Sequence, residues 1–367
     1  MIRRRTPNSS PNAPTPARRR VADGREPVVK IILDSGAYSV WKLGKQINLP
    51  EYCDYIDRNR DWIAHYVNLD VINPGNPEAA AAASFENLVY MRSRGLDPMP
   101  VFHVGEDISW LYKMLDLGCR HIGLSASSLV SRNQVDDWYA HAWSYLVNSD
   151  GLPLVRVHAF GEARYKSLVK FPWASADSAS WIYEAERAAT MLLEDGRKVN
   201  MRRDGISLAN AQYVGAMDDL DRGALNTLAA TVGLKDLSLL DRCDTDSRAL
   251  RLFIAALFYK AQVERINKKC PIRFHPPGFI KNVPRTDLSV IHLPEMEFYL
   301  VCGTNPLALA AIAFLGYRHV LASFFVIKQL KSSGYSSGYA ADPISAIRAD
   351  KSYAQYLVIL EKYLEKR

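Results

Sequence analysis

The chain lacks several features that mark common protein classes. Its cysteines are widely spaced and form no Cys-x-x-Cys pair: Cys53, Cys119, Cys243, Cys270 and Cys302. This spacing indicates neither a disulfide framework nor a zinc ribbon, and it favours reduced thiols in a cytoplasmic protein. The longest apolar stretch, residues 306–317, is too short to span a bilayer, so we expect no membrane partner. No Gly-x-Gly-x-x-Gly motif follows the first apolar run, which counts against a dinucleotide-binding fold.

The charge is unevenly distributed. Residues 1–27 carry seven arginines against two acidic residues, a net charge of +5 out of +7 for the whole chain. This segment is rich in Pro, Ser, Asn and Arg, lacks the apolar core of a secretory signal, and has almost nothing to bury. We predict a disordered basic tail, which is either a solvated leader or a phosphate-binding arm. With 48% apolar residues in the whole chain, the remainder is expected to form a sizeable core.

Short apolar runs alternate with longer helical patterns from residue 28 onward. The runs predict strands at 29–33, 64–72, 98–104, 120–125, 153–161, 173–181, 297–303 and 318–327. Helices are predicted at 48–60, 77–95, 108–118, 133–148, 162–169, 305–316 and 342–365. Strands that alternate with helices pair in parallel through crossover connections. Eight such units predict an α/β fold of the TIM (β/α)8 barrel type.

A long segment, 182–296, separates the sixth and seventh predicted strands. It includes a helical pattern at 247–267, part of which could be the sixth barrel helix, and a Pro-rich stretch at 270–279. We predict a helical insertion or subdomain here. The predicted organisation is a tail at 1–27, six βα units at 28–181, this insertion, and the last two units with a terminal helix at 297–367.

Polar residues stand at the carboxyl ends of the first six predicted strands: Asp34, Asp70, His103, Ser125, His158 and Asp177. Each alone could be a turn, cap or core residue, but in such barrels these positions carry the chemistry. The sequence shows no His-x-His motif and no His–Asp pairing typical of a barrel hydrolase metal site. Paired carboxylates without a metal are typical of chemistry at an acetal-like carbon, with one as nucleophile and the other as proton donor.

Several segments resemble one enzyme superfamily. LDSGAY (33–38) is similar to the DSGG/DSGAF motif of the tRNA-guanine transglycosylases, and SADSAS (175–180) to the segment that carries the nucleophile in archaeal members. VNLD, FHVGE, IGLS and VHAFG follow between them in the family's order. The chain most resembles the shortened phage and bacterial relatives, pentosyltransferases that exchange guanine in DNA for a 7-deazaguanine. The resemblance covers about residues 28–181.

The resemblance implies a role for each strand end. Asp177 would be the nucleophile at C1′ of the sugar, and Asp34 the general acid and base. Asp70 would accept hydrogen bonds from the guanine N1–H and 2-amino group. The other residues expected to bind the base are Ser35, Gly36, His103, Gly123, Ser125 and His158. Contacts to the polymer are expected from Tyr38, Trp41, Lys42 and Trp181, since aromatic rings can stack on exposed bases.

The implied partners are DNA and a free 7-deazaguanine base, and a homodimer is left open. The tRNA enzymes carry a Cys-x-Cys-x-x-Cys zinc cluster that this sequence lacks. We therefore predict no cofactor, with a zinc site on Cys243, Cys270, His275 and Cys302 as an open alternative. Three other functions stay open: exchange in tRNA instead of DNA, a metal-dependent barrel hydrolase, and a non-catalytic nucleic-acid-binding barrel.

Overall fold

A computed structural model describes most of the predicted strand-and-helix region. It covers residues 30–183 and 244–324, apart from gaps at 62, 127–130, 270–272, 279–286, 294, 302–305 and 318, together with 358–364 and scattered residues between 185 and 242. The predicted basic tail and most of the predicted terminal helix lie outside these residues. Within them, no helix is both long and apolar enough to cross a bilayer.

Eight parallel strands form one curled sheet, and each overlaps a predicted strand. They are β1 (Lys30–Asp34), β2 (Ile63–Tyr66), β3 (Val101–His103), β4 (His121–Ser125), β5 (Arg156–Phe160), β6 (Ser175–Ser178), β10 (Glu297–Val301) and β11 (His319–Ser323). The order across the sheet is β2-β1-β11-β10-β6-β5-β4-β3, and all paired neighbours run parallel. The α/β class is confirmed, and the strand order is consistent with a TIM-like barrel.

The two edge strands of this sheet, β2 and β3, meet at one point. Just beyond β2 and just before β3, Val67 and Met99 form an isolated parallel bridge. There the Asn68 N–H donates to the Met99 carbonyl at 2.8 Å, and the Met99 N–H donates to the Tyr66 carbonyl at 2.9 Å. The sheet therefore curls until its edges touch, without a continuous ladder across this junction.

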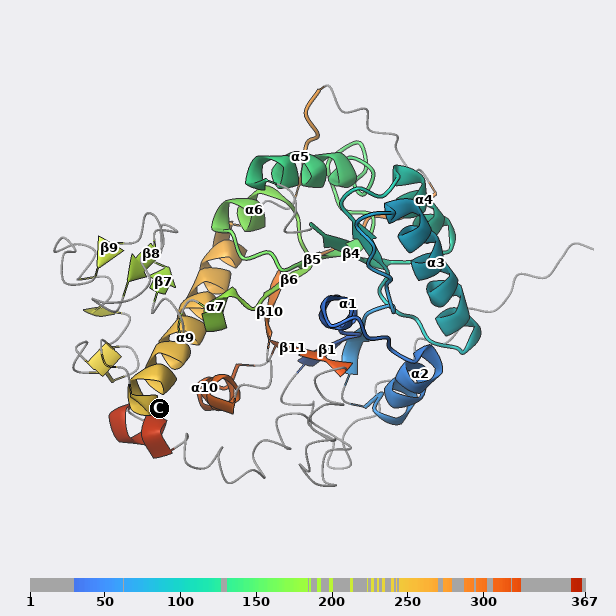
Figure 1. Cartoon of the computed structure of the whole chain (residues 1–367). Helices are drawn as coiled ribbons and strands as arrows, with labels where there is room; N and C mark the ends of the chain where they lie inside the picture. Colours follow the sequence, from blue (N-terminus) through green and yellow to red (C-terminus); the bar gives the residue numbers. More distant parts are fainter. Residues whose placement is uncertain are drawn as a thin grey trace, which may run out of the picture.

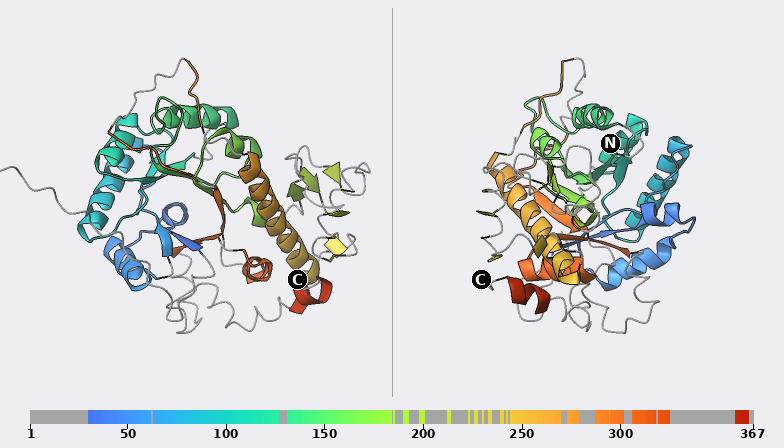
Figure 2. Two further views of the ribbon diagram at one scale, coloured as in Figure 1. Left: turned by 180° about the vertical axis from the view of Figure 1, so that it is seen from behind. Right: turned by 60° about the vertical axis from the view of Figure 1, so that its left-hand side comes forward.

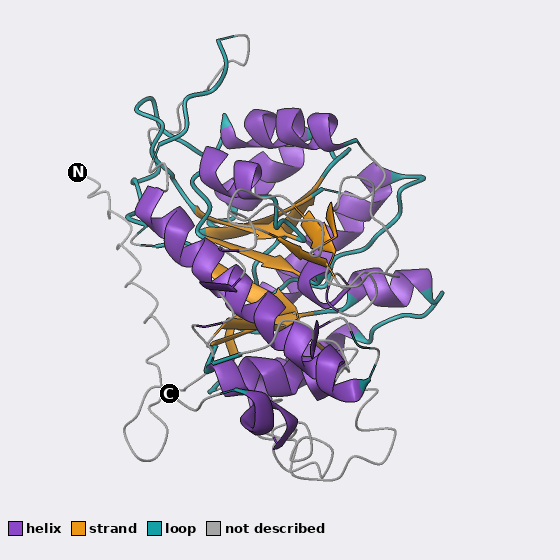
Figure 3. Ribbon diagram, turned by 90° about the vertical axis from the view of Figure 1, so that its left-hand side faces the viewer, coloured by secondary structure: helices purple, strands orange, loops and turns teal. Residues whose placement is uncertain are grey.

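Helices surround the sheet in chain order (Figure 1). They are α2 (Leu49–Arg58), α3 (Pro77–Ser93), α4 (Ile108–Asp116), α5 (Arg132–Trp143), α6 (Tyr165–Lys170), α9 (Thr245–Lys269) and α10 (Pro306–Leu315). Asn48 and Asn76 cap α2 and α3 through their side-chain oxygens, each just before a proline in the first turn. The long helix α9 crosses the outer side of the sheet (Figure 3) and packs against α10.

The segment 182–296 differs from the prediction of a helical insertion. Besides α9 it contains a small sheet of β7 (Thr190–Leu192), β8 (Lys198–Asn200) and β9 (Gln212–Tyr213), in which β7 and β8 are antiparallel. This sheet lies beyond α9, away from the main sheet (Figures 1 and 2). A sequence signal for it is two apolar runs separated by a short stretch that contains Gly196, a hairpin pattern that the helical prediction overlooked.

Alternation along the strands divides the buried residues into two sets. On β1, Ile31 and Leu33 pack outward with residues of α2, whereas Ile32 joins a cluster on the inner face of the curled sheet. That inner cluster contains Ile32, Val67, Met99, Val101, Tyr299 and Leu321. Because alternate strand residues share a face, Lys30 and Asp34 flank Ile32 on the inner side. The inner face is thus polar at both ends and apolar in the middle.

A group of titratable residues occupies the amino end of the inner face. Glu297 at the start of β10 forms an ion pair with Lys30 at 2.5 Å and accepts from the Tyr299 hydroxyl at 2.7 Å. The rings of His65 and His121 meet edge to face, with centroids 4.7 Å apart. Burial, followed by the charge of Arg156, lowers the pKa of His65 to about 4. Burial also lowers the pKa of His121 well below its ordinary value.

The lowered pKa of His65 gives a testable pH dependence. In the folded chain the pKa of His65 is about 4, whereas in the unfolded chain it is about 6.5. Below pH 6.5 the unfolded chain therefore binds a proton that the folded chain does not. The free energy of unfolding is highest above pH 6.5 and falls as the pH is lowered towards about 4. Relative to His65→Gln, the wild type should therefore lose up to about 3 kcal/mol of unfolding free energy over this window.

Urea unfolding of both proteins from pH 7 to pH 4 measures this difference. Other groups titrate in the same window, and comparing the two proteins removes their shared contribution. A difference that stays constant with pH would contradict the burial of a neutral His65.

Candidate active site

The turn after β1 explains the sequence LDSGAY. Gly36 has φ 87° and ψ 17°, the left-handed region that a residue with a Cβ occupies only under strain, and it precedes the short helix α1 (Ala37–Lys42). The Gly36 N–H donates to Asp34 Oδ2 at 3.1 Å, and the Ala37 N–H donates to Ser35 Oγ at 3.3 Å. The turn therefore fixes the Asp34 carboxyl group at the carboxyl end of β1.

Asp34 lies in an environment that favours its protonated form. Burial, then the negative charge of Asp70, then that of Asp177, together raise its pKa to about 7, against weaker opposing hydrogen bonds from the turn. Three carboxyl groups from different strand ends thus act on one another electrostatically. A carboxyl group with a pKa near neutrality can both donate and accept a proton under physiological conditions.

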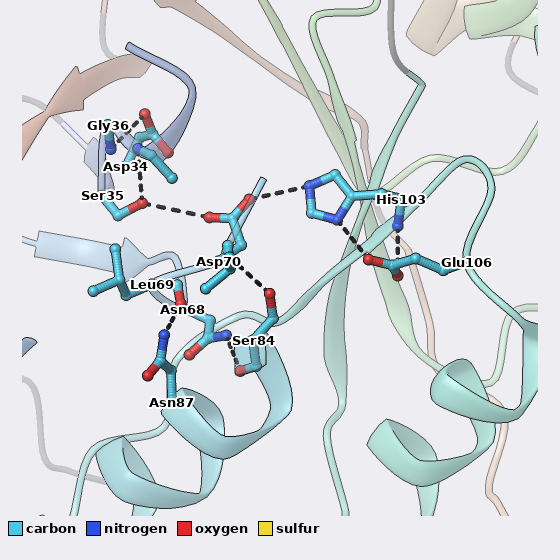
Figure 4. A network of polar contacts seen from close by, with 12 residues as sticks. Asp34, Ser35, Gly36, Asn68, Leu69, Asp70, Ser84, Asn87, His103 and Glu106 are labelled. Carbon is cyan, nitrogen blue, oxygen red and sulfur yellow. Dashed lines mark hydrogen bonds and ion pairs between the residues drawn. The ribbon is translucent and has the colours of Figure 1, made fainter. Parts of the chain in front are cut away.

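Asp70, which follows β2, belongs to a chain of polar contacts (Figure 4). Its Oδ2 atom lies 3.0 Å from His103 Nε2, and its Oδ1 atom accepts from Ser35 Oγ at 3.4 Å. The backbone next to it is held from α3: Ser84 contacts Asn68 and Val71, and Asn87 donates to the Leu69 carbonyl. Asp70 is therefore fixed both through its carboxylate and through its backbone.

His103 at the end of β3 lies between two carboxylates (Figure 4). Its Nε2 atom contacts Asp70, and its Nδ1 atom lies 3.1 Å from Glu106 Oε1. Burial disfavours the charged ring, but hydrogen bonds to Asp70 and Glu106 outweigh it and raise the pKa of His103 to about 10. The ring is therefore an imidazolium at neutral pH.

Asp177 on β6 is held from the neighbouring strand β5. His158 Nε2 lies 3.0 Å from Asp177 Oδ1, and the Gly161 N–H donates to the same oxygen at 3.1 Å. The other ring nitrogen of His158 lies 2.8 Å from Ser175 Oγ. His158 is fully buried and Asp177 is 5% exposed. Both contacts fall on Oδ1, so they leave Oδ2 for other chemistry.

The predicted base-binding residues on β4 have different surroundings. A Cβ atom at Gly123 would lie 2.3 Å from the Phe160 ring, so this ring occupies the space that the glycine leaves. The Phe160 ring also contacts His158 edge to face, with centroids 4.5 Å apart. Ser125 ends β4, where its carbonyl accepts from the Val104 N–H at 3.1 Å. Gly123 is therefore covered in this structure, and Ser125 lies at the same edge of the sheet as His103.

The residues predicted to contact a polymer separate into two environments. Tyr38 and Trp41 on α1 are 48% and 40% exposed, their rings lie 5.8 Å apart, and Lys42 lies over the Tyr38 ring at 4.5 Å. Trp181 is fully buried, and its indole N–H donates to the Val301 carbonyl at 3.3 Å. Its ring is therefore a core group and is not presented to a base.

Sequence reasoning missed the pairing of each histidine with an aspartate. His103 pairs with Asp70 and His158 with Asp177, contacts that were not anticipated from the sequence, where His–Asp pairing was considered only as a mark of a hydrolase metal site. His158 and Asp177 lie on the paired strands β5 and β6, whereas Asp70 lies a short way beyond β2 and His103 ends β3. Glu106 was also overlooked as a contact of His103, despite its position three residues later in the quoted segment FHVGE.

Among the residues that the structure describes, no three His, Cys, Asp or Glu side chains gather as metal ligands would. Three members of the alternative zinc set, Cys243, Cys270 and Cys302, lie outside the described residues. Comparison of the chain with protein-family models, curated proteins and solved structures gave no match. The resemblance to the transglycosylases therefore depends on the sequence motifs alone.

The electrostatic coupling at this site can be tested directly. In Asp177→Asn one of the two neighbouring negative charges is removed, so the pKa of Asp34 should fall below about 7, while burial and Asp70 keep it above the ordinary value of 3.8. Carboxyl-carbon NMR titration of aspartate-labelled protein measures this pKa.

The matched control is Asp61→Asn at an exposed position in the turn before β2, which should leave the Asp34 titration unchanged. An Asp34 that titrates near 3.8 in the wild type would show that the carboxyl groups do not interact as described.

Proposed function

We propose that the protein is a (β/α)8-barrel transglycosylase that exchanges guanine in DNA for a 7-deazaguanine base, as a member of the tRNA-guanine transglycosylase superfamily. The observation that carries the proposal is the contrast between two carboxyl groups. Asp177 accepts hydrogen bonds from His158 and Gly161, whereas Asp34 has a pKa near 7. A retaining glycosyl transfer needs one carboxylate nucleophile and one proton-transferring carboxyl group.

The barrel itself is part of this proposal. The order of the eight strands is the one expected for a closed ring, and the bridge between Val67 and Met99 joins the two edges. Closure of the ring would bring the ends of β1, β2, β3, β5 and β6 around one mouth, where barrel enzymes hold their substrates. Asp34, Asp70, His103 and Asp177 lie at, beside or just beyond these strand ends, and His158 lies in the middle of β5.

In the first step, Asp177 Oδ2 attacks C1′ of the target nucleotide. The C1′–N9 bond breaks, its electron pair goes to the guanine, and protonated Asp34 supplies the proton that the departing base needs. The product is a sugar bonded covalently to Asp177, together with free guanine. Hydrogen bonds from His158 and Gly161 to Oδ1 hold the carboxylate in place for this attack.

The second step reverses the first with another base. A 7-deazaguanine attacks C1′ through N9, the bond between C1′ and Asp177 breaks, and its electron pair returns to the carboxylate. Asp34, now ionised, takes the proton from N9 of the incoming base. A pKa near 7 suits this alternation because the group is needed in both states during one cycle. Two inversions at C1′ retain the configuration of the sugar.

Asp70 is the proposed reader of the base. A carboxylate only accepts hydrogen bonds, which suits the N1–H and 2-amino donors of guanine and rejects adenine. His103 uses one side of Asp70 Oδ2, and Ser35 makes a long contact of 3.4 Å to Oδ1. Each carboxylate oxygen has two lone pairs, so this arrangement leaves acceptor capacity for a base.

The surface next to the site suits a nucleic acid. Helix α1 follows directly from Asp34 and carries the exposed rings of Tyr38 and Trp41 beside Lys42. In Figures 1 and 2 this helix lies inside the ring of surrounding helices, near its axis. Aromatic rings with a neighbouring cation can stack on unpaired bases and contact phosphates. A base in a duplex must leave the stack to react, so the neighbouring bases need such support.

Base exchange can be measured with radiolabelled guanine and purified polymers. We expect incorporation into DNA, with little or none into unfractionated tRNA, and displacement of the label by 7-cyano-7-deazaguanine. Labelling of tRNA alone would change the substrate, and labelling of no polymer would contradict the transglycosylase proposal. Nucleoside mass spectrometry of DNA from cells that express the protein with a 7-deazaguanine supply provides the corresponding test in vivo.

The covalent step predicts a nucleic acid–protein adduct. Wild-type protein incubated with a DNA substrate should give an adduct that survives denaturing electrophoresis, and Asp177→Asn should abolish it because an amide is a poor nucleophile. Exchange should fall by a factor of at least about 1,000, while DNA binding measured by fluorescence anisotropy stays near the wild-type value.

Asp61→Asn is the matched control and should retain both the adduct and the exchange activity. An adduct that persists in Asp177→Asn would assign the nucleophile to another residue.

A further inference from the structure

Glu106 is a buried carboxylate that the proposed reaction does not use. Its side chain is 4% exposed, although it lies in the turn just after β3. Oε2 accepts from the His103 N–H at 3.0 Å, and Oε1 lies 3.1 Å from His103 Nδ1. Both oxygens of Glu106 therefore contact the same residue, one through its backbone and the other through its ring.

The two contacts fix the ring of His103 in one orientation. Glu106 reaches the ring at Nδ1, so Nε2 points away from the turn and towards Asp70 Oδ2 at 3.0 Å (Figure 4). Carboxylates only accept hydrogen bonds, so a ring between two of them must donate from both nitrogens. A neutral ring would leave one lone pair facing a carboxylate oxygen. The geometry thus selects an imidazolium with a single orientation.

We propose that Glu106 is a positioning residue for base recognition, which orients His103 so that His103 holds Asp70 Oδ2 and leaves Asp70 Oδ1, which makes the long 3.4 Å contact with Ser35, to accept from the base. This inference rests on the proposed function, because it assigns Asp70 as the base reader. The proposal also changes the role expected for His103. Its two ring nitrogens contact Asp70 and Glu106, so His103 would hold Asp70 in place and would not bind the base itself.

Four side chains carry the contacts between Glu106 and the end of β1: Glu106, His103, Asp70 and Ser35. His103 faces Asp70 from the segment after β2 and Glu106 from its own turn, and these two groups are the ones that raise its pKa. Asp70 in turn faces Asp34 and Ser35 from the end of β1. These contacts connect Glu106 to Asp70 through His103, which is the route along which a change at Glu106 would act on the base.

Two substitutions separate orientation from charge. In Glu106→Gln, the amide oxygen can accept from the His103 N–H while the amide nitrogen donates to Nδ1, so a neutral ring keeps its orientation and still donates from Nε2 to Asp70. In Glu106→Ala both contacts are lost and the ring is free to turn. The matched control is Glu78→Gln, an exposed carboxylate that accepts from the Trp110 indole at 3.0 Å.

The kinetic test measures KM for guanine and kcat in the exchange assay. Asp70 contacts the base in the ground state and in the transition state alike, so Glu106→Ala should raise KM about tenfold or more with a smaller effect on kcat. Glu106→Gln should stay within about threefold of the wild-type KM, as expected when orientation is what matters. Unchanged KM in Glu106→Ala would overturn the proposal, and so would a Glu106→Gln variant as impaired as Glu106→Ala.

A second measurement does not depend on turnover. Nitrogen NMR of the histidine rings should show two protonated nitrogens for His103 at pH 7 to 8 in the wild type, and one unprotonated nitrogen in Glu106→Gln. A neutral His103 in the wild type would overturn the inference even if exchange activity is present.

If no polymer is labelled but the ring is an imidazolium that Glu106→Gln neutralises, the transglycosylase proposal fails while the Glu106–His103 pairing stands. Should Glu106→Ala not fold, the nitrogen shifts and the Glu106→Gln kinetics decide the question.

Discussion

The burial of Asp34 beside two other carboxyl groups is the constraint on which the site depends. Asp34, Asp70 and Asp177 come from three strand ends, and the charges of the other two act on Asp34. Two of the three have a histidine partner: His103 for Asp70 and His158 for Asp177. Among the residues that the structure describes, the hydrogen bonds to the Asp34 carboxyl group come from the N–H groups of its own turn. Burial, then the charges of Asp70 and Asp177, therefore raise the pKa of Asp34 to about 7, so three chemically identical groups differ in their surroundings.

The fold supplies these partners through two regularities. The paired strands β5 and β6 bring His158 beside Asp177, and the bridge between Val67 and Met99 brings the segment of Asp70 near His103. Alternation along each strand then directs residues two apart to the same inner face. Lys30, Ile32 and Asp34 illustrate the result on β1: a charged residue at one end, an apolar residue in the core, and the candidate acid at the other end.

Sequence analysis was strongest for features with a local cause. All eight strands of the main sheet overlap predicted runs, because short apolar runs bounded by helical patterns have few alternatives in an α/β chain. The polar residues at the strand ends could be named for the same reason. Helix α9 was also predicted closely, at 247–267 against the observed Thr245–Lys269.

Features that depend on contacts between distant residues were not predictable in the same way. The burial of Trp181 follows from its packing beside β10, more than a hundred residues away in the chain. The Phe160 ring over Gly123 depends on the register between β4 and β5. Glu106 could have been noticed, since a turn of three residues after a strand end can return a carboxylate to the strand's last residue. The small sheet of β7, β8 and β9 was not predicted, because the helical pattern at 247–267 led to the prediction of a helical insertion for the whole segment 182–296.

The junction between β2 and β3 gives the pair of Asp70 and His103 a second importance. Backbone pairing there is limited to the isolated bridge at Val67 and Met99, whereas the other neighbouring strands share ladders. The ion pair stands just beyond this bridge and links the same two segments through side chains. Within the described sheet, this junction therefore depends on the backbone pairing at Val67 and Met99 and on one ion pair. A weaker contact between Asp70 and His103 should loosen the two edges of the curled sheet at this place.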